Sequence, residues 1–226
     1  MFNSKTKWIA HRGYTLRAFE NSITAFLLAS KLPFWGIETD VHQTKDGVFV
    51  IHHDENMKHT TGIDMKISLS NLSELKALTY LGTHLHIVTF REYLNICVEN
   101  KKVAVIELKP FFTTTMIKEL LSIIEGANYL SNCVFISFEF DNLLRLRNIS
   151  KDVKIQFLTN QVDPVIIELC KEQKFDLNLD HIILSENLVN QLHNHQIQVN
   201  CWTIRNKDEA KKYIEFGVDF ITTDGF

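Results

Sequence analysis

The sequence has few of the residues that interrupt regular structure. Its 226 residues include only 8 glycines and 3 prolines, which is about half the average usage or less. Each of these residues is therefore expected at a place where the backbone requires it. Sixteen phenylalanines and a charged fraction of 23% indicate a packed globular core and exclude a disordered chain.

The four cysteines lack any metal-binding or disulfide-type spacing. Cys97, Cys133, Cys170 and Cys201 lie far apart, and no Cys-x-x-Cys pair is present. This spacing excludes a zinc ribbon and a dense disulfide framework. We expect buried free thiols in a reducing cytosol.

Long apolar runs and an excess of one charge are also missing. No run approaches the ~18 apolar residues of a membrane span, and residues 1–7 lead into a strand-like segment without an apolar signal stretch. Because 24 basic side chains face 27 acidic ones, with a net charge of −3, there is no basic field for nonspecific nucleic-acid binding. We expect a cytoplasmic protein without nucleic acid or stable membrane insertion.

Short apolar runs instead alternate with helical patterns along the whole chain. The expected strands are Lys7–His11, Gly36–Val41, Val103–Leu108, Cys133–Phe138, Val153–Leu158, His181–Leu184, Gln198–Ile204 and Asp219–Thr223. The expected helices are Ser22–Leu32, Leu72–Tyr80, Phe90–Glu99, Thr114–Glu125, Asn142–Ile149, Val165–Gln173, Glu186–His195 and Asp208–Phe216.

Local signals support several of these helix boundaries. Thr89 and Glu92 form a Thr-x-x-Glu capping box. Pro164 fits the first turn of its helix, and Gly217 stands where a helix ends in the left-handed conformation.

Eight strands separated by helices predict an α/β fold of parallel β/α units, closed into a (β/α)8 TIM-type barrel. An open doubly wound sheet is the structural alternative. No linker or composition shift divides the chain, so residues 1–226 are expected to form a single catalytic barrel domain. Residues 43–88 exceed what one helix needs and contain a further short strand, Val48–His52. We expect them to form a small insertion after strand 2, of the kind that is often functional.

Carboxylates alternate along two of the expected strands. Glu38 and Asp40 share one face of the second strand, and Glu107 and Lys109 share one face of the next barrel strand. Because buried carboxylates are costly unless they are paired, three of them inside a barrel predict an all-oxygen site for a hard cation such as Mg²⁺ or Ca²⁺. The alternative is a salt bridge from Lys109 to Glu107 or Glu38 with no metal.

Two of the ten histidines end strands at the face where barrel enzymes carry out catalysis. His11 ends the first strand, and His53 ends the short extra strand. A titrating imidazole pair beside a cation suits general acid–base chemistry near neutral pH. His84-x-His86 and His193-x-His195 lack a carboxylate or cysteine partner at a useful spacing, so we interpret them as solvated residues. His52 is expected on the opposite face from His53.

Taken in order, these fragments resemble the glycerophosphodiester phosphodiesterase family over nearly the whole chain. The motifs that carry the resemblance are His11-Arg12-Gly13, Glu20-Asn21-Ser22, Glu38-Thr39-Asp40-Val41, Thr44-Lys45-Asp46-Gly47, His53-Asp54, Thr60-Thr61, Ile106-Glu107-Leu108-Lys109, Trp202-Thr203, Gly217-Val218-Asp219 and Thr223-Asp224.

The resemblance implies a β/α barrel with an insertion after its second strand and metal-dependent hydrolysis of glycerophosphodiesters to an alcohol and sn-glycerol 3-phosphate. It further implies attack by the glycerol 2-hydroxyl and a cyclic phosphate that water opens. Matched by position, it implies an acid/base pair of His11 and His53, metal ligands Glu38, Asp40 and Glu107, and substrate contacts Arg12, Lys109 and Trp202. Which histidine is the acid does not follow from sequence.

The chain departs from the family pattern at several positions. Phe19 and Val88 replace prolines, Phe220 replaces a glycine, and Gly225-Phe226 replace an aromatic-Pro ending. Phe220 is expected to crowd the last strand or narrow the pocket. Since only two residues follow Asp224, a final helix is not expected, and Phe220 and Thr222 would need cover from a neighbouring helix, the amino-terminal segment or a second copy in a homo-oligomer.

Two other functions compete with the glycerophosphodiesterase. A phospholipase-D-like enzyme or cyclising lyase would use the same residues on larger phosphodiester lipids, although no amphipathic membrane-binding segment is evident. A non-catalytic ligand-binding barrel would not need the complete acid/base and metal set.

Overall fold

The computed structural model describes residues 5–109 and 111–226. Eight parallel strands form its barrel: β1 (Lys7–Ala10), β2 (Gly36–Gln43), β5 (Val103–Leu108), β6 (Cys133–Ser137), β7 (Lys154–Thr159), β8 (Asp176–Asp180), β9 (Val199–Ile204) and β10 (Phe220–Thr223). Strand β1 closes the sheet because it pairs with β10 on one side and β2 on the other. The predicted closed barrel is confirmed, and an open sheet is excluded.

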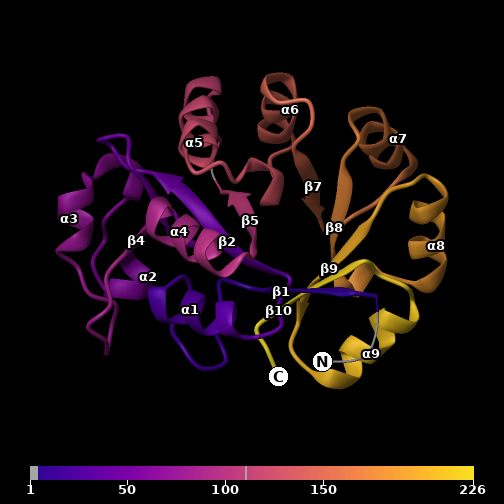
Figure 1. The fold of residues 1–226 in the computed structure, drawn as a ribbon, viewed down its shortest axis with the longest axis horizontal. Helices are drawn as coiled ribbons and strands as arrows, with labels where there is room; N and C mark the ends of the chain where they lie inside the picture. Colours follow the sequence, from indigo (N-terminus) through magenta and orange to yellow (C-terminus); the bar gives the residue numbers. More distant parts are fainter. Residues whose placement is uncertain (1–4, 110) are drawn as a thin grey trace.

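Helices surround the strands in a ring when the barrel is viewed along its axis (Figure 1). They are α1 (Ile23–Lys31), α4 (Phe90–Asn100), α5 (Thr114–Gly126), α6 (Phe140–Ile149), α7 (Pro164–Gln173), α8 (Glu186–Asn194) and α9 (Lys207–Glu215). The capping box of Thr89 and Glu92 begins α4, and Pro164 occupies the first turn of α7. Gly217 follows α9 with φ of +85°, so all three predicted boundary signals are confirmed.

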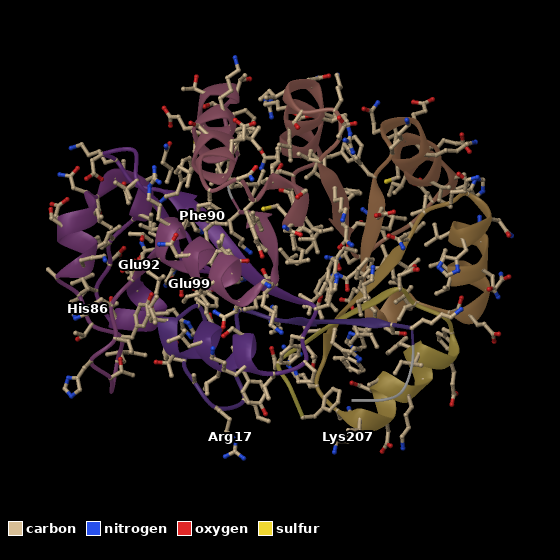
Figure 2. All side chains as sticks on the ribbon, in the orientation of Figure 1. Arg17, His86, Phe90, Glu92, Glu99 and Lys207 are labelled. Atoms are coloured by element: carbon tan, nitrogen blue, oxygen red, sulfur yellow. The ribbon has the colours of Figure 1, made fainter. Side chains whose placement is uncertain are left out.

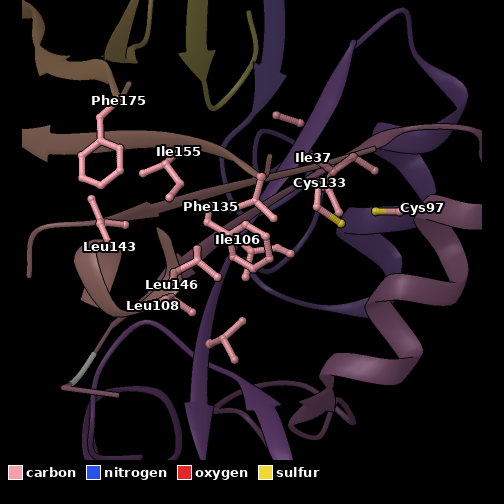
Figure 3. Close-up of a cluster of buried hydrophobic side chains, with 14 of the residues drawn as sticks. Ile37, Cys97, Ile106, Leu108, Cys133, Phe135, Leu143, Leu146, Ile155 and Phe175 are labelled. Atoms are coloured by element: carbon pink, nitrogen blue, oxygen red, sulfur yellow. The ribbon is translucent and has the colours of Figure 1, made fainter. Parts of the chain in front are cut away.

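Alternating side chains divide the core into two layers. The outer layer lies between strands and helices and includes Ile106, Phe135 and Ile155, which meet Leu143 and Leu146 of α6 (Figure 3). The inner layer lies inside the barrel and consists of Ile9, Val105, Val134, Ile136, Leu158 and Phe220. Ile136 and Leu158 of this layer border a cavity that polar side chains also line.

The segment between β2 and α4 forms a separate lobe at the side of the ring (Figure 1). It contains β3 (Phe49–Ile51), α2 (Lys58–Thr61), α3 (Leu72–Lys76) and β4 (Val88–Thr89). Strand β3 runs antiparallel to both β2 and β4. This lobe has its own small apolar core, so it holds β3 and the residues after it firmly against the barrel.

One predicted strand is wrong. Residues 181–184 are not a strand, because His181–Ile183 form a 3-10 helix whose first turn is capped by Asp180. Strand β8 lies just before it, at Asp176–Asp180. Polar Asn178 is buried inside the barrel, so this strand lacks the apolar run by which the other strands are recognised. The predicted helix Leu72–Tyr80 is also shorter, ending at Lys76.

The expectation for the last strand is also corrected. Phe220 and Thr222 do not point outward: Phe220 packs in the inner layer with its ring centroid 5.0 Å from that of Trp35, and Thr222 borders a cavity inside the barrel mouth. Ile221 is the outward residue and is fully buried. Phe220 is not among the residues that line this cavity, so it does not narrow it. The ring of Phe226 contacts Trp8 on the outside.

All four cysteines are buried free thiols, as the sequence predicts. Figure 3 shows Cys97 and Cys133 within the apolar layer. Within the described part of the chain, no helix combines the length and apolarity needed to cross a bilayer.

Candidate active site

Three carboxylates meet at the carboxyl-terminal mouth of the barrel. The parallel register of β2 and β5 places Asp40 opposite Glu107, and Glu38 lies two residues earlier on the same face. One oxygen atom from each of the three groups can be chosen so that all lie within 4.8 Å of one another. All three residues are buried, so the alternation in the sequence becomes a compact cluster of oxygen atoms.

The positive side chains beside the cluster do not fully neutralise its three carboxylates. Burial and the charge of Asp40 raise the pKa of Glu107 to about 7, and burial with the charges of Asp40 and Glu107 raises the pKa of Glu38 well above its usual value. Burial opposes ionisation of Asp40 too, but Arg12 and Lys109 hold its pKa below the usual range. A cation among these oxygens would remove the repulsion.

The donors present suit a hard divalent cation. All three are carboxylates, and Oδ1 of Asp40, though buried, accepts no hydrogen bond from the described chain. The salt bridge predicted as an alternative also exists, since Nζ of Lys109 lies 3.0 Å from Glu107 and 3.6 Å from Asp40. Lys109 thus pairs with Glu107 and Asp40. Among the ion pairs of the described residues, Glu38 has no lysine partner.

Arg12 borders the cluster from the β1–α1 connection. Its backbone N–H donates to Glu38 at 2.9 Å, and Nη1 donates to both carboxylate oxygens of Glu20, at 3.1 and 2.9 Å. Its Nε lies 3.3 Å from Asp40. Asn21, from the same connection, donates to Asp40 at 2.7 Å, so this loop fixes the carboxylates from above the strands.

His11 and His53 each use Nδ1 to contact an aspartate. Nδ1 of His11 lies 2.6 Å from Oδ1 of Asp224, and Nδ1 of His53 lies 2.7 Å from Oδ1 of Asp54. Burial, together with the positive charges of Arg12 and Lys109, lowers the pKa of His53. In each ring Nε2 has no hydrogen-bond partner among the described residues.

A cavity of about 200 Å³ brings these groups together at the mouth of the barrel. It is lined by His11, Arg12, Glu38, His53, Glu107 and Lys109 on its polar side. Trp202 and Phe138 form an aromatic wall on the other side, with ring centroids 5.7 Å apart. All eight residues selected from the sequence thus lie in or directly beneath one cavity, with Asp40 below it.

The other histidines lie elsewhere. His86 lies at the edge of the insertion (Figure 2), where its Nδ1 is 2.8 Å from the carbonyl oxygen of Leu78, and His193 pairs with Asp219 at 2.9 Å. His52 is buried and contacts Thr60 at 2.8 Å. His193 therefore has a carboxylate partner that its sequence spacing did not indicate, and the described residues offer a metal cluster only at Glu38, Asp40 and Glu107.

Several residues of the site were not selected from the sequence. The motifs quoted above include Asp224, Asp54 and Asn21, but the sequence predicted no functional role for them. Arg205 was not predicted as a site residue. His42 follows Glu38 and Asp40 on the same strand face, a period-2 signal that was available. Its Nε2 lies 3.3 Å from the carbonyl oxygen of His53, and burial lowers its pKa to about 4.

A (β/α)8 barrel with buried carboxylates, two histidines and two cationic side chains at its carboxyl-terminal mouth belongs to the class of barrel enzymes that act on anionic substrates. The sequence pattern of the Glycerophosphoryl diester phosphodiesterase family matches residues 11–226. The chain belongs to this family and is a phosphoric diester hydrolase.

Individual relatives agree with the family assignment. An uncharacterized protein of Mycoplasma genitalium is 32% identical over 69% of this chain and 68% of its own. A glycerophosphodiester phosphodiesterase of Caldanaerobacter subterraneus subsp. tengcongensis is 28% identical over 97% of this chain and 94% of its own.

Solved structures share the fold over almost the full length. A glycerophosphodiester phosphodiesterase of Parabacteroides distasonis superposes with a TM-score of 0.86 at 26% identity, covering 99% of this chain and 94% of its own. A phosphodiesterase of Oleispira antarctica, solved in complex with its product sn-glycerol 3-phosphate, gives a TM-score of 0.90 at 23% identity, covering 96% of this chain and 92% of its own.

Proposed function

We propose that this protein hydrolyses glycerophosphodiesters to an alcohol and sn-glycerol 3-phosphate, with a divalent cation and with His11 and His53 as the acid/base pair. The observation that carries the proposal is the convergence of both imidazoles, three carboxylates, Arg12 and Lys109 on one cavity of about 200 Å³. A phosphodiester anion and the glycerol group attached to it need such a combination of cations, proton carriers and an aromatic wall.

In this proposal the two histidines move the protons. One imidazole takes the proton of the attacking glycerol 2-hydroxyl, whose oxygen forms a bond to phosphorus as the bond to the leaving alcohol breaks. The other imidazole gives a proton to the departing alkoxide. Water then opens the cyclic phosphate with the roles of the two imidazoles reversed, which yields sn-glycerol 3-phosphate.

The cationic side chains stabilise the charge that develops on phosphorus. Arg12 and Lys109 stand beside the carboxylate cluster and face the cavity, where a low dielectric strengthens their attraction for phosphate oxygens. Glu38, Asp40 and Glu107 would hold Mg²⁺ or Ca²⁺, and the bound ion would act as a Lewis acid toward those oxygens. Trp202 orients the glycerol carbon chain against its ring.

A larger lipid substrate is the second candidate. Phe138 borders the cavity and is 48% exposed, so an acyl chain reaching out of the mouth would find an apolar surface there. One relative, at 24% identity, is a human lysophospholipase D. A lysophospholipid would keep the same chemistry and differ only in what extends beyond the glycerol.

Product analysis with three substrates separates these possibilities. Purified protein with Mg²⁺ is incubated with glycerophosphocholine, glycerophosphoethanolamine or lysophosphatidylcholine, and phosphorus NMR follows the products. We expect sn-glycerol 3-phosphate from the first two. A cyclic phosphate that persists would instead indicate a lyase. Preferential cleavage of lysophosphatidylcholine would indicate a phospholipase, and no turnover of any substrate would indicate a binding protein.

A further inference from the structure

The guanidinium group of Arg205 stands at the rim of the cavity with most of its donors unused. The residue follows β9 and lines the cavity beside His11 and Arg12, and its side chain is 65% exposed. Nε donates to Oδ2 of Asp224 at 2.8 Å. Within residues 5–109 and 111–226, neither Nη1 nor Nη2 of Arg205 has a hydrogen-bond partner.

The other two cations of the site are differently placed. Arg12 is held by both oxygens of Glu20 and lies 3.3 Å from Asp40. Lys109 contacts Glu107 and Asp40. Their charges therefore offset buried carboxylates, whereas Arg205 has one carboxylate partner among the described residues, Asp224, which also contacts His11.

The proposed reaction increases the charge that the site has to hold. A phosphodiester carries one negative charge, but a phosphomonoester carries about −1.5 to −2 near neutral pH. The added charge arises at the position on phosphorus that the alcohol has left. A guanidinium with two free N–H groups suits two phosphate oxygens, because its planar fork donates to both at once.

We infer that Arg205 is a phosphate-binding residue of this enzyme that recognises the phosphomonoester group of the product, and that Asp224 positions Arg205 and His11 together. The two oxygens of Asp224 face different partners: Oδ1 contacts the imidazole and Oδ2 accepts from the guanidinium. The inference rests on the proposed function and adds to it a third phosphate contact, coupled through one carboxylate to a proton-transferring group.

A neighbouring surface arginine provides a matched control. Arg17 lies on the β1–α1 connection, five residues after Arg12, and Figure 2 shows its side chain pointing away from the molecule. Arg17→Gln and Arg205→Gln therefore remove the same charge from the same end of the protein, but only the second removes donors from the cavity. Because Arg205 is largely exposed, its replacement is not expected to change the thermal unfolding midpoint.

The test is titration calorimetry of sn-glycerol 3-phosphate into the Mg²⁺-loaded protein at low ionic strength, where the contact of an exposed charge is least screened. We expect Arg205→Gln to weaken binding at least ~10-fold, as the loss of a charge-assisted contact does. Arg205→Lys keeps the charge but loses the planar pair of donors, so its affinity for sn-glycerol 3-phosphate should lie between those of wild type and Arg205→Gln. The affinity of Arg17→Gln should stay within ~2-fold of wild type. Wild-type affinity in Arg205→Gln, or no binding by the wild type, overturns the inference.

Asp224→Asn tests the positioning role separately. An amide has one acceptor oxygen, so it cannot serve both His11 and Arg205. We expect Asp224→Asn both to lower kcat and to weaken product binding. Arg205→Gln, by contrast, should mainly affect product binding and KM. A fall in kcat with unchanged product affinity would contradict positioning of Arg205. Hydrolysis by the wild type is measured in the same experiments, so failure of the proposed function is distinguishable from failure of this inference.

Discussion

Nδ1 of His11 lies 2.6 Å from Oδ1 of Asp224, a residue 213 positions further along the chain. The closure of the barrel brings them together, since Ala10 and Thr223 face each other in the pairing of β1 with β10. His53, by contrast, has its aspartate next to it in sequence. Two imidazoles from different elements thereby have the same arrangement, in which Nδ1 contacts an aspartate.

Replacing either imidazole should abolish most turnover while leaving metal binding intact. We expect His11→Ala and His53→Ala each to reduce kcat at least ~10²-fold, since positioned acid–base groups typically contribute this much. Steady-state assays with glycerophosphocholine measure the loss, and calorimetry with Mg²⁺ checks the ion site.

The matched control is His193→Ala. That histidine also contacts an aspartate, Asp219 at 2.9 Å, but it lies on α8 and does not line the cavity. Its replacement should leave kcat within ~2-fold of wild type. Near-wild-type hydrolysis by His11→Ala or His53→Ala would contradict the assignment of that residue.

Glu107→Gln should weaken divalent-cation binding strongly. The amide retains the size of the side chain but removes one of three negative charges from the cluster, and hard cations bind carboxylates far better than amides. We expect at least ~10-fold weaker Mg²⁺ binding in calorimetry and a matching shift in the Mg²⁺ concentration that gives half-maximal rate. Unchanged affinity would place the ion elsewhere.

The same carboxylate should make the cation-free protein sensitive to pH. Its pKa of about 7 exceeds the ordinary value of about 4.3, so the folded state holds a proton that the unfolded state has already lost between these pH values. Stability from Glu107 therefore decreases as pH rises through this window. Burial of His42, whose pKa is about 4, acts in the opposite direction, because the unfolded state binds the extra proton there.

Comparison with Glu107→Gln isolates the carboxylate from this opposing effect. With EDTA present, the free energy of unfolding of the variant relative to wild type should increase by about 2 kcal/mol between pH 5 and pH 7. Urea unfolding at both pH values measures it. A difference that does not change with pH would show that Glu107 ionises normally in the folded protein.

Trp202→Ala should raise KM for glycerophosphocholine at least ~5-fold with a smaller change in kcat, because in the proposed function the ring contacts the glycerol and no reacting atom. Trp202 also packs edge-on against Phe138, so Phe138→Ala distinguishes the two rings. If Phe138→Ala impairs lysophosphatidylcholine cleavage more than glycerophosphocholine cleavage, an acyl chain lies on that side of the mouth.

Strand periodicity was sufficient to predict the carboxylate cluster. Glu38 and Asp40 alternate with Ile37, Thr39 and Val41, so one face of β2 had to be acidic, and a parallel neighbour carrying Glu107 had to place it alongside. The barrel itself followed from repeated β/α units. These features depend on local order along the chain, which a sequence displays directly.

Features set by tertiary packing were predicted less well. Strand β8 was missed because the polar side chain of Asn178 is buried inside the barrel and lines the cavity, whereas apolar runs were the signal by which strands were predicted. Phe220 was placed on the wrong face, since a four-residue strand gives too few alternations to fix its orientation. Asp224 meets Arg205 across the pairing of β10 with β9, and it meets His11 only when β1 pairs with β10 to close the barrel, so neither contact has a spacing that the sequence displays.

The most direct test of the central claim is the rate of sn-glycerol 3-phosphate release from glycerophosphocholine before chelation, after chelation with EDTA and after return of Mg²⁺ or Ca²⁺. We expect the wild-type rate to fall to background on chelation and to recover with the returned ion, and His11→Ala to stay at least ~10²-fold below wild type whenever the ion is present. A wild-type rate that survives complete chelation, or no release of sn-glycerol 3-phosphate with either ion, would contradict the proposed metal-dependent hydrolysis.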